Sequence, residues 1–211
     1  SCAQKNSYQM GDYGYDAEFF KKNNVEFLEL KSEDGQSKVL IVPGYQGRVM
    51  TSTAAGDKGA SFGWINYKLV ESGQVSPQFN PLGGEERFWI GPEGGPNSIY
   101  FKEGDEQVYA NWVVPDAIDR DTYEIVAQDD KSVQFAKDAT FTTASGKEFK
   151  MGIDRTVSLL SKADVQALLN VEIADDLNFI AYQTDNSITN KGDSTWSKTY
   201  GAPSIWLLGM F

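Results

Sequence analysis

The sequence contains no histidine among its 211 residues. Imidazole is the side chain most used for proton transfer near neutral pH, and it is a frequent ligand of zinc. Serine–histidine triads and other histidine-based acid–base chemistry are therefore excluded within this chain. A P-loop and a dinucleotide-binding fingerprint are also missing, and the acidic turns at 116–121, 129–130 and 175–176 lack EF-hand spacing. We expect no cofactor and no metal.

Cysteine is nearly absent too, because Cys2 is the only one, and an internal disulfide is excluded. Ser1-Cys2 resembles the end of a bacterial lipobox, in which a small residue precedes the cysteine that is acylated after signal-peptide cleavage. The polar run that follows favours a flexible tether over residues 1–14. This interpretation predicts export, a lipid anchor at Cys2 and a place in the cell envelope, as an outer-membrane or periplasmic lipoprotein. The alternative is an unpaired thiol at a frayed terminus.

Basic residues are outnumbered, 19 against 30 acidic ones, which gives a net charge of −11. Such a surface repels phosphates and anionic headgroups, so no nucleic-acid partner is expected. Long apolar runs are missing as well, since none approaches the roughly 20 residues that span a bilayer. The most hydrophobic segment is 205–211, and an apolar strand needs neighbours to cover it. We therefore expect the protein to continue beyond Phe211.

What the chain does have is 13% aromatic residues, 20 glycines and many short apolar runs. This profile is typical of strands joined by turns. It predicts a mainly β fold, a large antiparallel β-sandwich with one or two short helices. Residues 15–211 then form the N-terminal part of a single domain.

Local patterns predict strands at 25–30, 37–43, 47–53, 98–101, 122–128, 133–141, 149–160 and 178–183, and helical turns at 15–22, 64–71 and 162–170. The strongest alternation of apolar and polar residues runs over 149–159, which only a strand satisfies. Arg155 falls in phase with its apolar face. A buried guanidinium needs partners, so Arg155 either forms an internal ion pair or lines a cleft.

Residues 76–95 are rich in glycine and proline around a charged and aromatic centre, and we predict a long irregular segment. Carboxylates and arginine bind sugar hydroxyls, and an aromatic face packs on the C–H surface of a sugar ring. The candidate ligand-binding residues of this segment are Glu85, Glu86, Arg87, Trp89 and Glu93. The alternative is a structural loop in which Arg87 pairs with Glu85 or Glu86 and Trp89 fills the core.

A second segment, 182–196, is dense in hydrogen-bonding side chains and ends in tryptophan. It adds Asn186, Asn190 and Trp196 to the ligand-binding candidates, together with Arg155. The alternative is a polar strand and loop that satisfies its own backbone.

The runs GGEERFWIGPEGG, IDRTVSLLS and DNSITNKGDSTWSKTYGAPSIWLLGMF resemble the galactose mutarotase-like (aldose 1-epimerase) superfamily, and most closely an uncharacterised family of secreted Bacteroidetes proteins. The resemblance covers the chain from about Val25 to Phe211. It implies a β-supersandwich with a carbohydrate site on its concave face. It also implies epimerase chemistry by a histidine acid and a glutamate base.

Both stretches that resemble the histidine motifs of that superfamily lack the histidine, 80–84 and 186–190. We therefore expect a domain that binds a mono- or oligosaccharide without histidine-based epimerase chemistry. The alternative is a sugar-active enzyme, an epimerase relative or a glycan-cleaving protein, with Glu86 or Glu93 as candidate carboxylates and further residues beyond Phe211. A third possibility is a structural module in which Trp89, Trp196 and Trp206 all belong to the core.

Overall fold

The chain folds into two antiparallel β-sheets that face each other, as described for residues 7–211 by a computed structural model. One sheet has the order β1-β2-β3-β4-β9, with β1 Leu28–Lys31, β2 Lys38–Val42, β3 Arg48–Thr53, β4 Glu86–Gly91 and β9 Ser204–Gly209. The other has the order β5-β6-β7-β8, with β5 Glu124–Gln128, β6 Ser132–Thr142, β7 Glu148–Leu159 and β8 Tyr182–Asn190. The predicted mainly β sandwich is confirmed.

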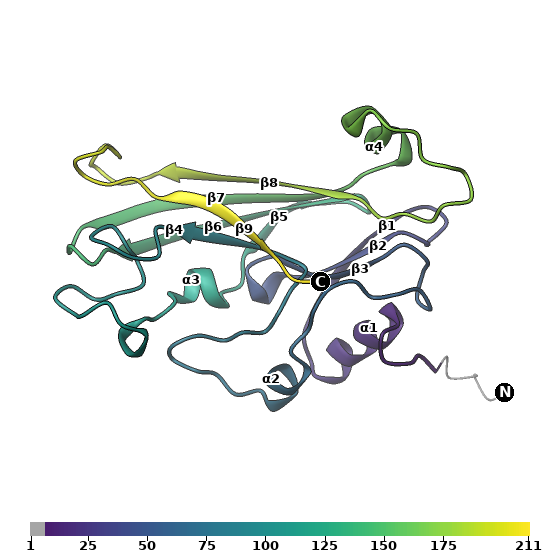
Figure 1. The fold of residues 1–211 in the computed structure, drawn as a ribbon, viewed down its shortest axis with the longest axis horizontal. Helices are drawn as coiled ribbons and strands as arrows, with labels where there is room; N and C mark the ends of the chain where they lie inside the picture. Colours follow the sequence, from purple (N-terminus) through teal and green to yellow (C-terminus); the bar gives the residue numbers. More distant parts are fainter. Residues whose placement is uncertain (1–6) are drawn as a thin grey trace.

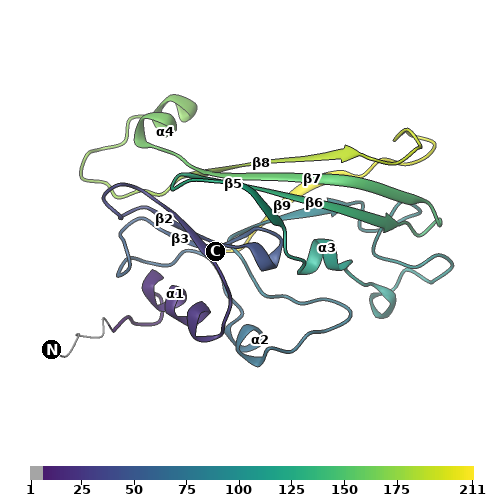
Figure 2. The ribbon, with the colours of Figure 1, turned by 180° about the vertical axis from the view of Figure 1, so that it is seen from behind.

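Four short α-helices accompany the sheets: α1 Tyr13–Lys22, α2 Tyr67–Ser72, α3 Asp116–Asp119 and α4 Lys162–Leu169. The first three lie on the face of the five-stranded sheet that points away from the four-stranded sheet (Figures 1 and 2). The fourth connects β7 to β8 and begins with a capping box, in which the Ser161 hydroxyl accepts from the Asp164 N–H. None of the helices in the described part of the chain is long and apolar enough to cross a bilayer.

Residues 12–14, the end of the range predicted as a tether, are part of the folded domain. Asp12 forms a β-bridge with Ala60, and Tyr13 is fully buried with its hydroxyl 2.7 Å from Glu29 Oε2. The chain therefore joins the fold by Asp12, inside the range 1–14 that the polar run suggested. Cys2, with its predicted lipidation, lies outside the described residues.

The main core lies between the two sheets. Because side chains alternate along a strand, Val39 and Ile41 of β2 point into this core, while Leu40 and Val42 point to the helices. The second set packs with Tyr13 and other buried residues of the helical side. Strands β2, β3 and β4 of the five-stranded sheet are therefore covered on both faces.

Two of the sequence predictions are wrong in this region of the fold. Residues 98–101, expected as a strand, form an irregular stretch with bends at 99–101, although Ser98, Ile99 and Tyr100 are buried. Their side chains pack on the core and the Tyr100 hydroxyl donates to the Ile90 carbonyl, so burial rather than strand pairing explains their apolar pattern. The second error concerns residues 76–95. Their centre forms β4, a strand flanked by β3 and β9.

Candidate functional site

The segment expected to be an irregular ligand loop turns into a strand at Glu86. β4 pairs with β9 at six positions, from Glu86 opposite Gly209 to Gly91 opposite Ser204. The two glycines before it have positive φ, +95° at Gly83 and +126° at Gly84. A Cβ at Gly83 would lie 2.4 Å from the Trp64 carbonyl oxygen. The glycine pair therefore lets the chain enter the middle of the sheet, where neighbouring backbone is too close for a side chain.

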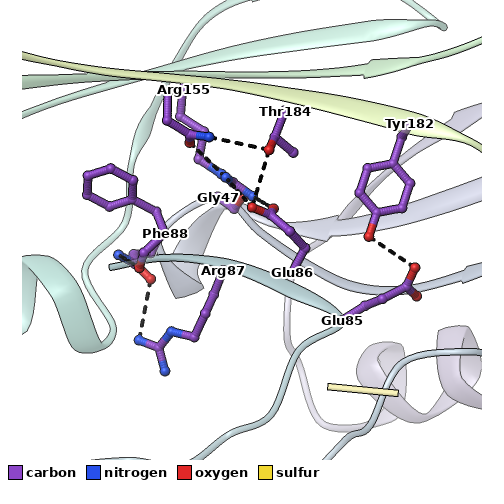
Figure 3. A network of polar contacts seen from close by, with 10 residues as sticks. Gly47, Glu85, Glu86, Arg87, Phe88, Arg155, Tyr182 and Thr184 are labelled. Atoms are coloured by element: carbon purple, nitrogen blue, oxygen red, sulfur yellow. Dashed lines mark hydrogen bonds and ion pairs between the residues drawn. The ribbon is translucent and has the colours of Figure 1, made fainter. Parts of the chain in front are cut away.

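Glu86 and Arg155 form an ion pair between the two sheets (Figure 3). Arg155 is fully buried on β7 and also donates to the Gly47 carbonyl (2.9 Å) and to Asn186 Oδ1 (2.9 Å). Thr184 donates to Glu86 Oε1 at 3.3 Å. Of the two alternatives for Arg155, the internal ion pair is the one observed. Asn186 lies opposite Arg155 in the β7–β8 register and completes this network.

Arg87 lies on the opposite face of β4 and pairs with neither Glu85 nor Glu86. Its Nη2 donates to the Ile118 carbonyl at 2.7 Å, and its guanidinium lies over the Trp89 ring at 4.7 Å. Burial lowers the pKa of Arg87 to about 10. The side chain is therefore a buried cation held by a carbonyl and an aromatic face.

Trp89 is 4% exposed and stacks on Tyr100 with a centroid distance of 5.4 Å. Its indole N–H donates to Glu93 Oε1 at 2.5 Å, and the Trp112 indole donates to Glu93 Oε2 at 3.0 Å. Trp89 lies on the same face of β4 as Arg87 and is buried in one continuous hydrophobic cluster with the residues between the sheets. Both carboxylate oxygens of Glu93 accept from indoles. Trp206, by contrast, is 42% exposed.

Asn190 and Trp196 lie at the far end of β8 from Tyr182. The Asn190 side chain donates to the Ser194 carbonyl (2.8 Å) and accepts from the Gly192 N–H (3.0 Å), so it holds its own loop. Trp196 is partly buried and packs edge-on against Phe149. The predicted site residues thus fall into three separate groups, and Glu85 stands apart from all of them.

Glu85 has the most unusual surroundings of the candidates. Its side chain comes from the residue before β4 and is 97% buried, since only 3% of its surface is exposed. Oε1 accepts hydrogen bonds from Ser52 Oγ of β3 (2.7 Å) and from the Tyr182 hydroxyl of β8 (3.0 Å). Oε2 is buried and has no hydrogen-bond partner among the described residues. A buried carboxylate oxygen without a donor is costly, so this atom has a hydrogen bond to gain.

Burial is also the main influence on the protonation of this carboxyl. It raises the pKa of Glu85, the hydrogen bonds from Ser52 and Tyr182 lower it in part, and the charge of Glu86 raises it further. Burial and the neighbouring Glu85 carboxylate likewise raise the pKa of Tyr182. Glu85 therefore gives up its proton at a higher pH than an exposed glutamate does, and Tyr182 keeps its proton to a higher pH than an exposed tyrosine.

Glu85 forms part of the wall of a pocket of about 450 Å³. The pocket lies at the seam between the sheets, that is, where residues of β3 and β8 meet around Glu85. Ser52 and Tyr182 supply its other polar groups, and Phe62, Ile180 and Phe211 supply apolar surface. Within the described residues, no group of three or more acidic or cysteine side chains is placed to hold a metal ion. The pocket is therefore a mixed polar and apolar site with one carboxyl group.

Sequence reasoning selected Glu85 but missed its partners. Tyr182 opens the polar segment 182–196, and its alternation with Thr184 and Asn186 would have placed it on the inner face of a strand. Ser52 and Phe62 carry no local signal, because only the fold brings them to Glu85.

The comparisons with known proteins place the chain in a family. No curated protein and no solved structure matches it. Residues 11–211 match the model of a family described as a family of unknown function, DUF6786. Since the match covers nearly the whole chain, the protein belongs to the DUF6786 family.

Proposed function

We propose that this protein is a carbohydrate-binding domain of a secreted or surface lipoprotein, and that the pocket around Glu85 is its binding site. The observation that carries the proposal is the buried carboxyl of Glu85 in a pocket wall that also holds two hydroxyl groups. Its Oε2 has no hydrogen-bond partner among residues 7–211. The likeness of three sequence runs to the galactose mutarotase-like superfamily supports the same class of ligand.

The pocket offers what a sugar ring requires. A sugar presents hydroxyls around its edge and C–H groups on its faces. Carboxyl, phenol and serine oxygens can bind the hydroxyls, while the Phe62 and Phe211 rings offer surface for the C–H groups. A volume of about 450 Å³ is within the range of about 300–1,000 Å³ that is usual for small-molecule sites.

Isothermal titration calorimetry against a panel of mono- and oligosaccharides tests the proposal. We expect at least one neutral or amino sugar to bind, and the variants Glu85→Gln and Tyr182→Phe to weaken that binding by about tenfold, or about 1.4 kcal/mol. Glu18→Gln, at an exposed position of α1, is the matched control and should bind as the parent protein does. Folded protein that binds no sugar at millimolar concentration would contradict the proposal.

A sugar-active enzyme is the second candidate, and the raised pKa of Glu85 favours it specifically. A carboxylic acid that keeps its proton can serve as a general acid. Glu86 and Glu93, the carboxylates suggested by the sequence, are bound to Arg155 and to two indoles, so this role passes to Glu85. Polarimetry of galactose and glucose tests the epimerase form. A mutarotation rate equal to that of buffer rejects it.

The lipoprotein part of the proposal depends on Cys2. We expect mass spectrometry of the protein extracted from its native membranes to find a diacylglycerol group on this cysteine. Cys2→Ala should then appear in the soluble fraction. An unmodified Cys2 in the native protein would reject the anchor while leaving the sugar site untouched.

A further inference from the structure

The Glu85 pocket has a distinct charge pattern. Among the residues that line it, Glu85 is the only one with an ionisable acidic or basic side chain apart from the Tyr182 phenol. No lysine or arginine of residues 7–211 contributes to the wall. The nearby Arg155 is already bound to Glu86, so its charge is matched within the protein.

Glu85 consequently receives only neutral donors, from Ser52 and Tyr182, while its own sheet neighbour Glu86 is also acidic. Neutral donors on one oxygen leave the carboxylate charge uncompensated in a buried place, and a buried charge without a counter-ion is strongly disfavoured. A ligand that brings a positive charge removes this cost, and it supplies the donor that Oε2 lacks. Because Oε2 is buried, contact with the ligand requires a small rotation of the carboxylate about its terminal torsion, which is broad in glutamate.

The rest of the wall suits the same ligand. Aromatic rings attract an ammonium group through their negative faces, and Phe62, Tyr182 and Phe211 contribute three rings to the wall. An anionic ligand would meet a carboxylate and no cation, on a protein whose net charge is −11. The net negative charge of the protein and the carboxylate of the pocket therefore both favour a cationic ligand.

We propose that the Glu85 pocket selects a sugar with a free protonated amine, a hexosamine, whose ammonium group binds the Glu85 carboxylate between the aromatic rings. This inference rests on the proposed function, because it names the class of sugar that the same pocket takes. N-acetylation removes the charge and should weaken binding. A uronic acid should bind least.

Calorimetry at neutral pH with five probes tests the inference: glucosamine, N-acetylglucosamine, glucose, glucuronic acid and the non-sugar amine cyclohexylamine. We expect glucosamine to bind at least about tenfold more tightly than glucose and N-acetylglucosamine. In Glu85→Gln this advantage should fall to about onefold, since the amide has no charge. In Glu18→Gln it should be unchanged. The comparison among ligands uses the unaltered protein, so it decides the question even where a variant does not fold.

The outcomes separate the two proposals. Equal affinity for glucose and glucosamine overturns the amine inference and leaves carbohydrate binding standing. Cyclohexylamine binding as tightly as glucosamine, with no neutral sugar bound, supports the charge selection and contradicts the sugar site. Absence of binding by all five probes overturns the amine inference. Tight binding of glucuronic acid does so as well.

Discussion

Two consecutive glutamates, Glu85 and Glu86, reach from the five-stranded sheet to the opposite one and meet different partners there. Glu86 meets Arg155 of β7 and is neutralised, with Thr184 as a further donor. Glu85 accepts from the Tyr182 hydroxyl of β8 and has no ion-pair partner in the described part of the chain. Adjacent residues therefore differ in their charge partners: the Glu86–Arg155 ion pair links the two sheets, whereas Glu85 has neutral donors.

Removing only one member of the Glu86–Arg155 ion pair should destabilise the protein more than removing both. Arg155→Met leaves the Glu86 carboxylate, whose side chain is 14% exposed, without its cation. We expect a loss of about 3–5 kcal/mol in the free energy of unfolding, because an unpaired buried charge remains. Urea unfolding of Arg155→Met, Glu86→Leu and the double variant measures this. The double variant should recover most of the loss, and strictly additive losses would show that the two side chains do not interact.

The buried carboxyl of Glu85 should make stability depend on pH. Its pKa is raised above the ordinary value of 4.5, so the folded state binds this proton more strongly than the unfolded state. The stabilising contribution is complete below pH 4.5 and is lost as pH rises through the folded pKa. Glu85→Gln has no proton to lose there, so its stability relative to the parent protein should increase as pH rises.

Urea unfolding of the two proteins at a series of pH values from about 4 to about 8 gives this difference. Burial also raises the pKa of Asp16 and Asp119. Both residues are present in the parent protein and in the variant, so their contributions drop out of the difference in stability. Glu18→Gln, which removes an exposed carboxyl of α1, is the control variant measured over the same pH series. A flat difference for Glu85→Gln would show that this carboxyl titrates alike in the folded and unfolded chain.

Among the elements, β4 shows why sequence patterns located some strands and missed others. β6 and β7 alternate between a buried and an exposed face, and this period of two is visible in the residues. β4 is buried on both faces but carries Glu86 on one and Arg87 on the other, between glycine-rich flanks. Its charges are satisfied by residues distant in sequence, such as Arg155, 69 positions later. The local sequence pattern does not reveal such distant partners, so the sequence of β4 resembles that of a loop.

The candidate site was likewise predictable only in part. Glu85 stood out as a carboxylate next to paired glycines, while the Ser52 and Tyr182 that define its chemistry lie 33 and 97 positions away. A sequence names the residue types that can bind a ligand. The fold decides which of them keep an unsatisfied atom.

The entry of the chain into β4 should depend on Gly83. An alanine there would have φ near +95° and a Cβ 2.4 Å from the Trp64 carbonyl oxygen. We expect Gly83→Ala to lower the free energy of unfolding by well over about 1 kcal/mol, because backbone must move. Gly73→Asn is the control. The φ of Gly73 is +61°, a Cβ built there would meet no neighbouring atom within 4 Å, and asparagine tolerates this conformation. A Gly83→Ala protein with an unchanged urea midpoint would contradict this account of the glycine pair.

For the molecule as a whole, the two sheets differ in how they are covered. The central strands of the five-stranded sheet lie between the four-stranded sheet and helices α1 to α3, whereas the four-stranded sheet packs on one side only (Figures 1 and 2). All residues of β3 are buried, and all residues of β5 are exposed. The pocket lies at the seam, with Glu85 from the first sheet and Tyr182 from the second. A ligand bound there contacts both sheets.

This asymmetry predicts an order of local opening that hydrogen–deuterium exchange with mass spectrometry can measure. Amides of β2 and β3 should exchange most slowly, because opening them exposes both cores, and amides of β5 should exchange fastest among the strands, because β5 is an edge strand paired with β6 alone. A ligand in the pocket should slow exchange around Glu85 and Tyr182 together, since it binds residues of both sheets. Protection of β5 equal to that of β3 would mean that the exposed face of the four-stranded sheet is covered in solution.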